Sequence, residues 1–144
     1  MLNIEVKYAA ADAKLPTRGS ADAAGWDLYT IHGGIIEPGE TVLFHTGLEM
    51  AIPHGWCGMI YARSGLGIKK GLAPANKVGV IDADYRGEII VALHNHGSEP
   101  HYINAGDRIA QMIFAPVPNV TWLQVNELSD TIRGEGGFGS SGTN

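Results

Sequence analysis

The sequence predicts an all-β protein, a jelly-roll-like barrel or sandwich of short antiparallel strands with one short helix. The 144 residues include 20 glycines and 7 prolines. These recur about every eight to twelve residues and separate short runs rich in β-branched and aromatic side chains. Polar and apolar residues alternate over residues 3–8 and 88–95, as expected for strands with one buried face. This spacing is typical of sandwiches and barrels and not of βαβ units.

Six runs are predicted as strands, because each combines β-forming residues with a boundary of Gly, Pro, Asn or Asp. In chain order they are residues 3–8, 41–52, 56–62, 87–95, 107–117 and 121–126. Only residues 63–71 are predicted to hold a helix, of about two turns, with Ser64 as a possible N-cap. Residues 1–132 are predicted to form one β domain, of a size that buries roughly 70% of its unfolded surface.

The last segment, residues 133–144, is a separate glycine-rich arm with the sequence RGEGGFGSSGTN. It has too few apolar residues to fold alone and is predicted to be mobile without a ligand. It also contains Arg133 and Phe138, which a mere linker does not need. A mobile arginine can close over a polyphosphate and a phenylalanine can cap a base. Taken alone, such a tail is more often a disordered end.

The composition argues against several classes of protein. A net charge of −5 disfavours a broad nucleic-acid-binding face, which requires a basic patch. No apolar run approaches the ~20 residues of a membrane helix, and no apolar leader follows Met1, so the expected compartment is the cytoplasm. Cys57 is the only cysteine and forms no disulfide within the chain. The six histidines lack the HExxH spacing, and no metal is assigned to them.

Residues 63–67, Arg-Ser-Gly-Leu-Gly, are a candidate phosphate-binding segment. A guanidinium, a hydroxyl and free backbone N–H groups at a helix start suit phosphate oxygens. Gly65 lets the backbone approach a ligand closely. Taken alone, Arg63, Ser64 and Gly65 are more often a helix cap than a ligand site.

Residues 79–88, GVIDADYRGE, place a short acidic turn between two apolar runs, as in a β-hairpin. Asp82 follows Val80 and Ile81, so its carboxylate is expected at a strand end beside apolar surface, where it can act as a base. Tyr85 offers a flat face that can stack on a sugar. A turn of solvated charges is the usual alternative for an isolated hairpin.

Two further polar residues stand in apolar surroundings. Gln111 interrupts the run 107–117, where it either faces solvent or orients a water molecule. Asp27, within residues 24–28, either reaches a hydrated cation or braces a turn, and bracing is the more common role.

Together and in this order, the segments resemble the five motifs of the homotrimeric dUTPases. The matching stretches are AGWDL (24–28), RSGLG (63–67), GVIDADYRGE (79–88), GDRIAQM (106–112) and RGEGGFGSSG (133–142). The resemblance covers nearly the whole chain, although Trp26 stands where the family usually has a smaller aromatic residue. It implies a jelly-roll-like homotrimer with three active sites between subunits. In each site one subunit supplies the third motif, a second supplies the second and fourth motifs, and a third donates its arm.

The resemblance implies hydrolysis of dUTP to dUMP and pyrophosphate, which limits uracil incorporation into DNA and supplies dUMP for thymidylate synthesis. It implies Mg²⁺ as cofactor, carried on the triphosphate, since this ion prefers phosphate oxygens and water. Asp82 matches the general base that activates a water for attack on the α-phosphorus, and Gln111 matches the residue that holds this water. Arg133 matches the arm's γ-phosphate arginine, and Asp27 matches a residue tied to the metal through water.

The same resemblance implies the substrate contacts. Tyr85 matches the tyrosine that packs on deoxyribose and excludes a 2′-hydroxyl, and Phe138 matches the ring over uracil. The residues that match the uracil-reading hairpin are Asn76, Val80, Ile81 and Ile90. Those that match phosphate contacts are Arg63, Ser64, Gly65, Gly139 and Ser140.

Three other classes of protein compete with this interpretation. A dCTP deaminase shares the fold and the trimer, but it needs a catalytic glutamate beside the base and usually an RSS motif, whereas Gly65 follows Ser64 here. The sequence therefore predicts no release of ammonia from dCTP. A nucleotide-binding module without activity would be expected to have lost Asp82, Gln111 or the arm. A structural jelly roll such as a coat protein accounts for the strands but not for five ordered polar motifs.

Overall fold

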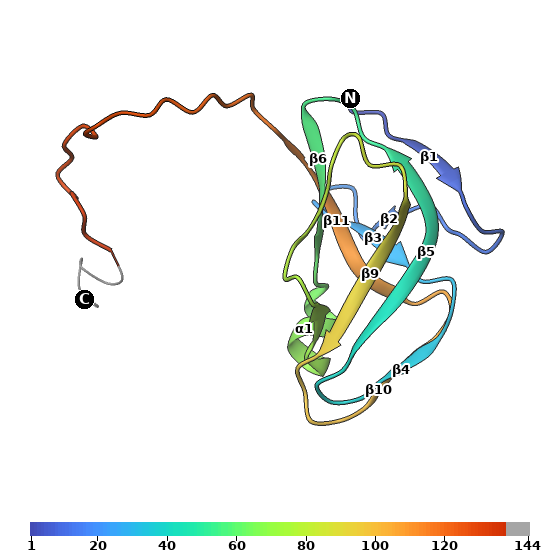
Figure 1. The fold of residues 1–144 in the computed structure, drawn as a ribbon. Helices are drawn as coiled ribbons and strands as arrows, with labels where there is room; N and C mark the ends of the chain where they lie inside the picture. Colours follow the sequence, from blue (N-terminus) through green and yellow to red (C-terminus); the bar gives the residue numbers. More distant parts are fainter. Residues whose placement is uncertain (138–144) are drawn as a thin grey trace.

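Two open antiparallel sheets, packed against each other, form the body of the molecule (Figure 1). The computed structural model describes residues 1–137 of the chain. The predicted all-β, jelly-roll-like fold is confirmed in its sandwich form, because the sheets built by the described residues do not close into a barrel. The predicted strands 3–8, 41–52, 56–62, 87–95 and 107–117 are each confirmed to within two residues at either end.

The first sheet has four strands and places β5 and β9 at its centre. In spatial order the strands are β1 (Glu5–Tyr8), β5 (Thr41–Ala51), β9 (Glu88–Asn95) and β7 (Leu72–Pro74). In β9, Ile89, Val91 and Leu93 are at most 2% exposed and alternate with less buried residues. This two-residue period turns one face of the strand toward the second sheet.

The second sheet carries four of the residues predicted to form a site, Asp27, Val80, Ile81 and Gln111. In spatial order its strands are β2 (Thr17–Arg18), β3 (Trp26–Tyr29), β11 (Arg108–Pro116), β6 (Trp56–Tyr61) and β8 (Gly79–Ile81). A separate ribbon pairs β4 (Gly34–Ile36) with β10 (His101–Ile103) at one end of the molecule (Figure 1).

Side chains from both sheets share one core. Burying a large aliphatic or aromatic side chain contributes ~1.5–3 kcal/mol, so this shared cluster fixes the two sheets face to face. Its buried members are Leu28, Ile36, Phe44, Leu48, Met50, Ile60, Leu72, Ile89, Val91, Leu93, Ile103, Ile109, Ala110 and Met112.

The helix α1 (Ser64–Lys70) follows β6 and lies within the predicted range. The predicted capping role of Ser64 is wrong, because Arg63 occupies the N-cap position in an extended conformation and no side chain caps the helix. Ser64 is instead the first helical residue, which leaves its hydroxyl at the open end of the helix. The helix ends where Gly71 is left-handed, with φ of 66°. Among the described residues no helix is long and apolar enough to cross a membrane.

The chain leaves the sheets after β11 and runs outward from the body (Figure 1). The strand predicted over residues 121–126 is wrong, because this segment is not paired and every residue from 116 to 135 is exposed. A strand needs partners for its backbone N–H and C=O groups, and none of the described strands lies beside this segment. The division of the chain between residues 132 and 133 stays a prediction.

Candidate active site

Three neighbouring strands bring the first group of predicted residues together. Gln111 in β11 pairs with Asp27 in β3 on one side and with Tyr61 in β6 on the other. Arg63 and Ser64 follow one residue after the end of β6, where α1 begins. Residues from the first, second and fourth motifs therefore meet at one end of the second sheet.

Asp27 is the centre of a charge network in this group. Its Oδ1 accepts a hydrogen bond from Arg63 Nε at 2.7 Å, and its Oδ2 accepts one from Arg108 Nη1 at 3.2 Å. Arg63 Nη1 also donates to the Arg108 carbonyl oxygen at 3.4 Å. Asp27 is only 8% exposed, so its charge requires these partners. The geometry gives Asp27 a bracing contact, and it holds the Arg63 guanidinium in one orientation.

Gln111 lies over Gly25. Its Nε2 donates to the Ala62 carbonyl oxygen at 2.9 Å, and its Oε1 would be 2.2 Å from a Cβ atom at position 25. A side chain at position 25 would therefore displace the Gln111 amide from its present position. The cleft beside it has a volume of about 220 Å³. Its lining residues are Gly19, Ala23, Gly25, Asp27, Arg63, Ser64, Arg108 and Gln111.

Arg108 belongs to this cleft, and the sequence reasoning missed it. Strict alternation would place Arg108 and Gln111 on opposite faces of β11, because they are three positions apart. The pairing of β11 with β3 shifts register between Arg108 and Ala110. An irregularity of this kind re-aims side chains, which allows both residues to line one cleft. The only signal in the sequence was the presence of Arg108 within the motif GDRIAQM.

The second group of predicted residues lies on the turn between β8 and β9. Asp82 follows β8 directly and is exposed, and its carbonyl oxygen accepts a hydrogen bond from the Tyr85 N–H at 3.2 Å. Arg86 Nη1 donates to the carbonyl oxygens of Ala83 and Tyr85 at 2.7 and 2.8 Å. The Arg86 side chain therefore fixes the turn by binding two of the turn's backbone carbonyl oxygens. None of the hydrogen bonds among residues 1–137 uses the Asp82 carboxylate.

The residues predicted to read a base flank this turn. Val80 and Ile90 are 58% and 37% exposed, and Ile81 is half-buried. Asn76 is exposed on the turn before β8, with its amide beside Gly79. Because β8 is an edge strand of its sheet, it can offer backbone N–H and C=O groups to a planar ligand.

One chain does not bring the two groups together. Asp82 follows Ile81, which pairs with Gly58, whereas Gln111 pairs with Tyr61. Asp82 is thus displaced by four residues along β6, roughly 13 Å at the rise of a strand. Two strand spacings, about 4.8 Å each, also separate β11 from β8. We call the first group the phosphate half-site and the second the uracil half-site, after the ligand parts that their family counterparts are implied to bind.

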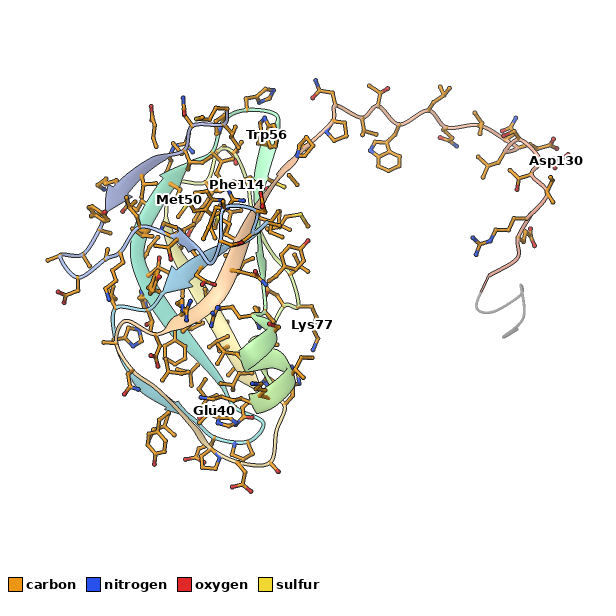
Figure 2. The ribbon with its side chains drawn as sticks, turned by 180° about the vertical axis from the view of Figure 1, so that it is seen from behind. Glu40, Met50, Trp56, Lys77, Phe114 and Asp130 are labelled. Carbon is orange, nitrogen blue, oxygen red and sulfur yellow. The ribbon has the colours of Figure 1, made fainter. Side chains whose placement is uncertain are left out.

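The described residues that follow β11, 117–137, run away from the body that carries both half-sites (Figure 1). Figure 2 shows Asp130 far from the body, on the extended run that leads to Arg133. Arg133 Nε donates to the Gly136 carbonyl oxygen at 2.7 Å, within the segment itself. The predicted residues Phe138, Gly139 and Ser140 lie outside the described part of the chain.

The donors present fit a metal ion that arrives with a phosphate ligand. Within residues 1–137, no group of three or more His, Cys, Asp and Glu side chains is placed to hold an ion. Both carboxylate oxygens of Asp27 are bonded to arginines, which fits a contact through water. Mg²⁺ commonly keeps several waters and takes its other ligands from substrate phosphates.

Replacing Asp27 by asparagine is expected to lower the free energy of unfolding by about 1.5–3 kcal/mol, the range for hydrogen bonds to charged groups. Asparagine removes the charge between Arg63 and Arg108 and turns an NH₂ group toward a guanidinium. Urea denaturation at one protein concentration measures the change. Glu49→Gln is the matched control, because Glu49 pairs with Lys7, whose side chain is 74% exposed, and such pairs contribute ~0–1 kcal/mol. Equal losses in the two variants would contradict the bracing contact.

Comparison with known proteins places the chain among one group of enzymes. Residues 11–142 match the family model described as dUTPase. A protein of Desulfitobacterium hafniense, named deoxyuridine 5'-triphosphate nucleotidohydrolase, is 48% identical over 146 residues, which cover 98% of this chain and 97% of that protein. A protein of the same name from Yarrowia lipolytica is 44% identical, with coverage of 99% and 91%.

Solved structures agree with the sequence comparisons. The dUTPase of Staphylococcus bacteriophage 80alpha, solved with dUPNHPP, has a TM-score of 0.90 at 28% identity and covers 97% of this chain and 98% of its own. A mutant dUTPase of phage phi11 of S. aureus, solved with a structural Mg(II) ion, has a TM-score of 0.80 at 25% identity, with coverage of 87% and 97%. The family model and the relatives both span nearly the whole chain, and the chain belongs to the dUTPase family.

Proposed function

We propose that the chain hydrolyses dUTP to dUMP and pyrophosphate by attack of water on the α-phosphorus. The observation that carries the proposal is the separation of two incomplete half-sites on one chain. The phosphate half-site has positively charged groups and an amide, but its carboxylate is already bonded to arginines. The uracil half-site has an exposed carboxylate, but it has no arginine held in place to bind phosphate. Two neighbouring chains would supply both. The names of the relatives support dUTP as the substrate.

In this reaction Asp82 acts as the general base. It lies at the end of β8, beside the half-buried Ile81, and its carboxylate is exposed to incoming water. Gln111, anchored through Nε2 to the Ala62 carbonyl oxygen, directs its remaining amide oxygen at the same water. Positioned proton transfer of this kind contributes ~10²–10⁴-fold to a rate. The proton passes from the water to the Asp82 carboxylate as the oxygen attacks.

The phosphate half-site binds the triphosphate. Asp27 fixes the Arg63 guanidinium through Nε, so its outer N–H groups are held ready for phosphate oxygens. Ser64 adds a hydroxyl at the open end of α1. At Gly65 nothing lies within 4 Å of the Cβ position, so a phosphate can approach the backbone closely. Preorganised donors of this kind stabilise the charge that develops on the phosphates.

The uracil half-site reads the base and the sugar. The edge strand β8 offers backbone donors and acceptors to uracil, with Val80, Ile90 and Asn76 around the ring. A base with a different donor and acceptor pattern would leave buried polar groups unpaired, which is costly. Tyr85 packs on deoxyribose and leaves no room for a 2′-hydroxyl. The Arg133 and Phe138 of another chain's arm close over the γ-phosphate and the uracil, with Gly139 and Ser140 as further phosphate contacts.

A homotrimer is the proposed assembly, and the exposed apolar surface of the described chain supports association. A groove of about 480 Å³ is lined mostly by apolar residues, including Trp26, Trp56 and Phe114. Figure 2 shows Trp56 and Phe114 at the end of the body from which the chain departs. The departing segment exposes further apolar side chains that its own body does not cover. They are Val120, Trp122, Leu123, Val125, Leu128 and Ile132.

Mg²⁺ is the proposed cofactor. Bound to the triphosphate, it would neutralise phosphate charge, and Asp27 is the residue of the chain that would reach its water shell. The arginines of the phosphate half-site and of the arm supply the remaining positive charge.

A pyrophosphate-release assay tests the proposed function. The molecular mass of the purified protein in solution is measured first. The protein is then given dUTP, dTTP, dCTP or UTP, with and without Mg²⁺. We expect release from dUTP with Mg²⁺, little from the other three, and the mass of a trimer. Binding of dUTP without any pyrophosphate would instead favour a binding module, and ammonia from dCTP would favour a deaminase.

Replacing Tyr85 by alanine is expected to admit UTP, because the ring that excludes the 2′-hydroxyl is removed. The ratio of kcat/KM for dUTP to that for UTP should fall by about tenfold or more, which corresponds to ~1.4 kcal/mol or more of discrimination. Steady-state rates with both nucleotides measure the ratio. Tyr102→Ala is the control, since Tyr102 is exposed on the distant β10 ribbon. An unchanged ratio in Tyr85→Ala would contradict a role in sugar selection.

A further inference from the structure

The side chain of Glu88, at the start of β9, is bonded to the opposite strand. Its Oε2 lies 2.8 Å from His45 Nδ1, and its Oε1 accepts a hydrogen bond from the Gly47 N–H at 2.7 Å. Both partners belong to β5. The side chain of Glu88 is 24% exposed, so the carboxylate is partly shielded from water and its two bonds are stronger than surface pairs.

The two bonds hold an irregular stretch of β5. The register of β5 with β9 is regular up to His45, which pairs with Ile90, and resumes at Glu49, which pairs with Glu88. Between them Gly47 is left-handed, with φ of 67°. A Cβ at Gly47 would also come within 2.9 Å of a neighbouring side chain, so glycine is required. The Glu88 carboxylate supplies the acceptor that the displaced Gly47 N–H needs.

The backbone of Glu88 is tied to Tyr85. The Tyr85 hydroxyl donates to the Glu88 carbonyl oxygen at 3.0 Å. The ring lies close over Gly87, where a Cβ would be 2.4 Å from the hydroxyl oxygen. The ring that faces the sugar in the proposed function is therefore fixed by the residue whose side chain is fastened to β5.

The charges around Glu88 favour its ionised form. Burial alone raises the pKa of Glu88, but the hydrogen bonds from His45 and Gly47, together with the charges of His45 and His32, outweigh it and bring the pKa below its ordinary value. Glu49 is directed to Lys7. A lowered pKa means that the contribution of Glu88 to stability is present at neutral pH and is lost as the pH falls through the lowered pKa.

We infer that His45 and Glu88 are positioning residues for Tyr85, and that they sharpen the discrimination between deoxyribose and ribose. This inference rests on the proposed function, because it assigns Tyr85 to the sugar. The path runs from His45 and Gly47 to the Glu88 carboxylate, along the Glu88 backbone to its carbonyl oxygen, and from there to the Tyr85 hydroxyl. When the carboxylate is removed, the start of β9 is no longer fastened to β5, and the ring gains freedom to move away from the sugar.

The test measures kcat and KM for dUTP and UTP in a set of variants of the full-length chain. In Glu88→Ala the dUTP/UTP ratio of kcat/KM should fall about tenfold, mainly through better use of UTP. Glu88→Gln should restore the ratio, because its amide oxygen accepts from Gly47 and its NH₂ donates to His45. Tyr85→Phe, which keeps the ring but loses the hydroxyl, should show the same partial loss as Glu88→Ala. Glu49→Ala is the matched control and should behave like the unaltered chain.

A second measurement does not depend on turnover. Amide hydrogen exchange over residues 82–88 should accelerate in Glu88→Ala and stay slow in Glu88→Gln. If Glu88→Ala does not fold, His45→Ala replaces it in both measurements. This substitution removes one of the two contacts of the Glu88 carboxylate. The inference is overturned if Tyr85→Ala loses sugar selectivity while folded Glu88→Ala and His45→Ala keep it and exchange slowly. If the unaltered chain releases no pyrophosphate from dUTP, the proposed function fails instead, and the exchange result still reports on the fastening of the turn.

Discussion

Asparagine in place of Asp82 is expected to lower kcat for dUTP by at least ~10²-fold while leaving its binding almost intact. The two side chains have the same shape, so the turn and its bonds from Arg86 should persist. The amide, unlike the carboxylate, cannot take a proton from the attacking water. Steady-state turnover and equilibrium binding of a non-hydrolysable dUTP analogue measure the two effects separately.

The same turn supplies a matched control for this substitution. Asp84 is an exposed carboxylate two residues from Asp82, and Asp84→Asn should leave kcat within a few-fold of that of the unaltered chain. A near-normal kcat in Asp82→Asn would remove this carboxylate as the base. Equal losses of kcat in Asp82→Asn and Asp84→Asn would show that turnover depends on the total charge of the turn. They would not support one carboxylate as the acceptor of the proton.

A chain that ends at residue 132 is expected to keep its sheets and lose nearly all turnover. The buried core residues and the partly buried side chains packed against them all precede residue 115, so folding should not depend on the arm. An arginine that stabilises the charge of a phosphoryl-transfer transition state contributes ~10³–10⁵-fold to kcat, and Arg133 would do so on the leaving pyrophosphate. Circular dichroism and solution mass check the fold and the assembly, and pyrophosphate release checks the activity.

Single substitutions then separate the parts of the arm. Arg133→Ala should cost most of what the truncation costs, because the remaining arm residues supply no cation. Arg133→Lys should recover only part of the rate, because lysine cannot offer a guanidinium fork to phosphate. A truncated chain with full activity would show that the arm is dispensable.

The sequence predicted the longer strands of the two sheets but missed the short strands β2, β3, β4, β7 and β10, which also pair within the chain. Residues 121–126 have the composition of a strand, yet they stay unpaired in the described structure. β-propensity reports how well side chains suit a pleated surface, and it does not supply the neighbouring strand. Ser64 shows a related limit, since a serine beside a helix start is as compatible with the first helical position as with the cap.

The motifs predicted Asp27, Arg63, Ser64 and Gln111, which the structure brings to one cleft, whereas contacts that depend on geometry alone were missed. Arg108 reaches Asp27 only because the register of β11 shifts beside it, and no local pattern announces such a shift. His45 and Glu88 are 43 positions apart, and the irregular stretch of β5 brings them together. Contacts of this kind follow from the packed sheets, so they become visible only in the folded chain.

Mixing two inactive chains tests the central claim most directly. Full-length Asp82→Asn and the chain ending at residue 132, co-expressed in equal amounts, form mixed trimers in which one chain supplies Asp82 and another supplies the arm. If each site takes these two parts from different subunits of a symmetric trimer, about a quarter of all sites regain both parts, and about a quarter of the activity should return. No recovery in mixtures of confirmed mixed composition would contradict an active site shared between chains.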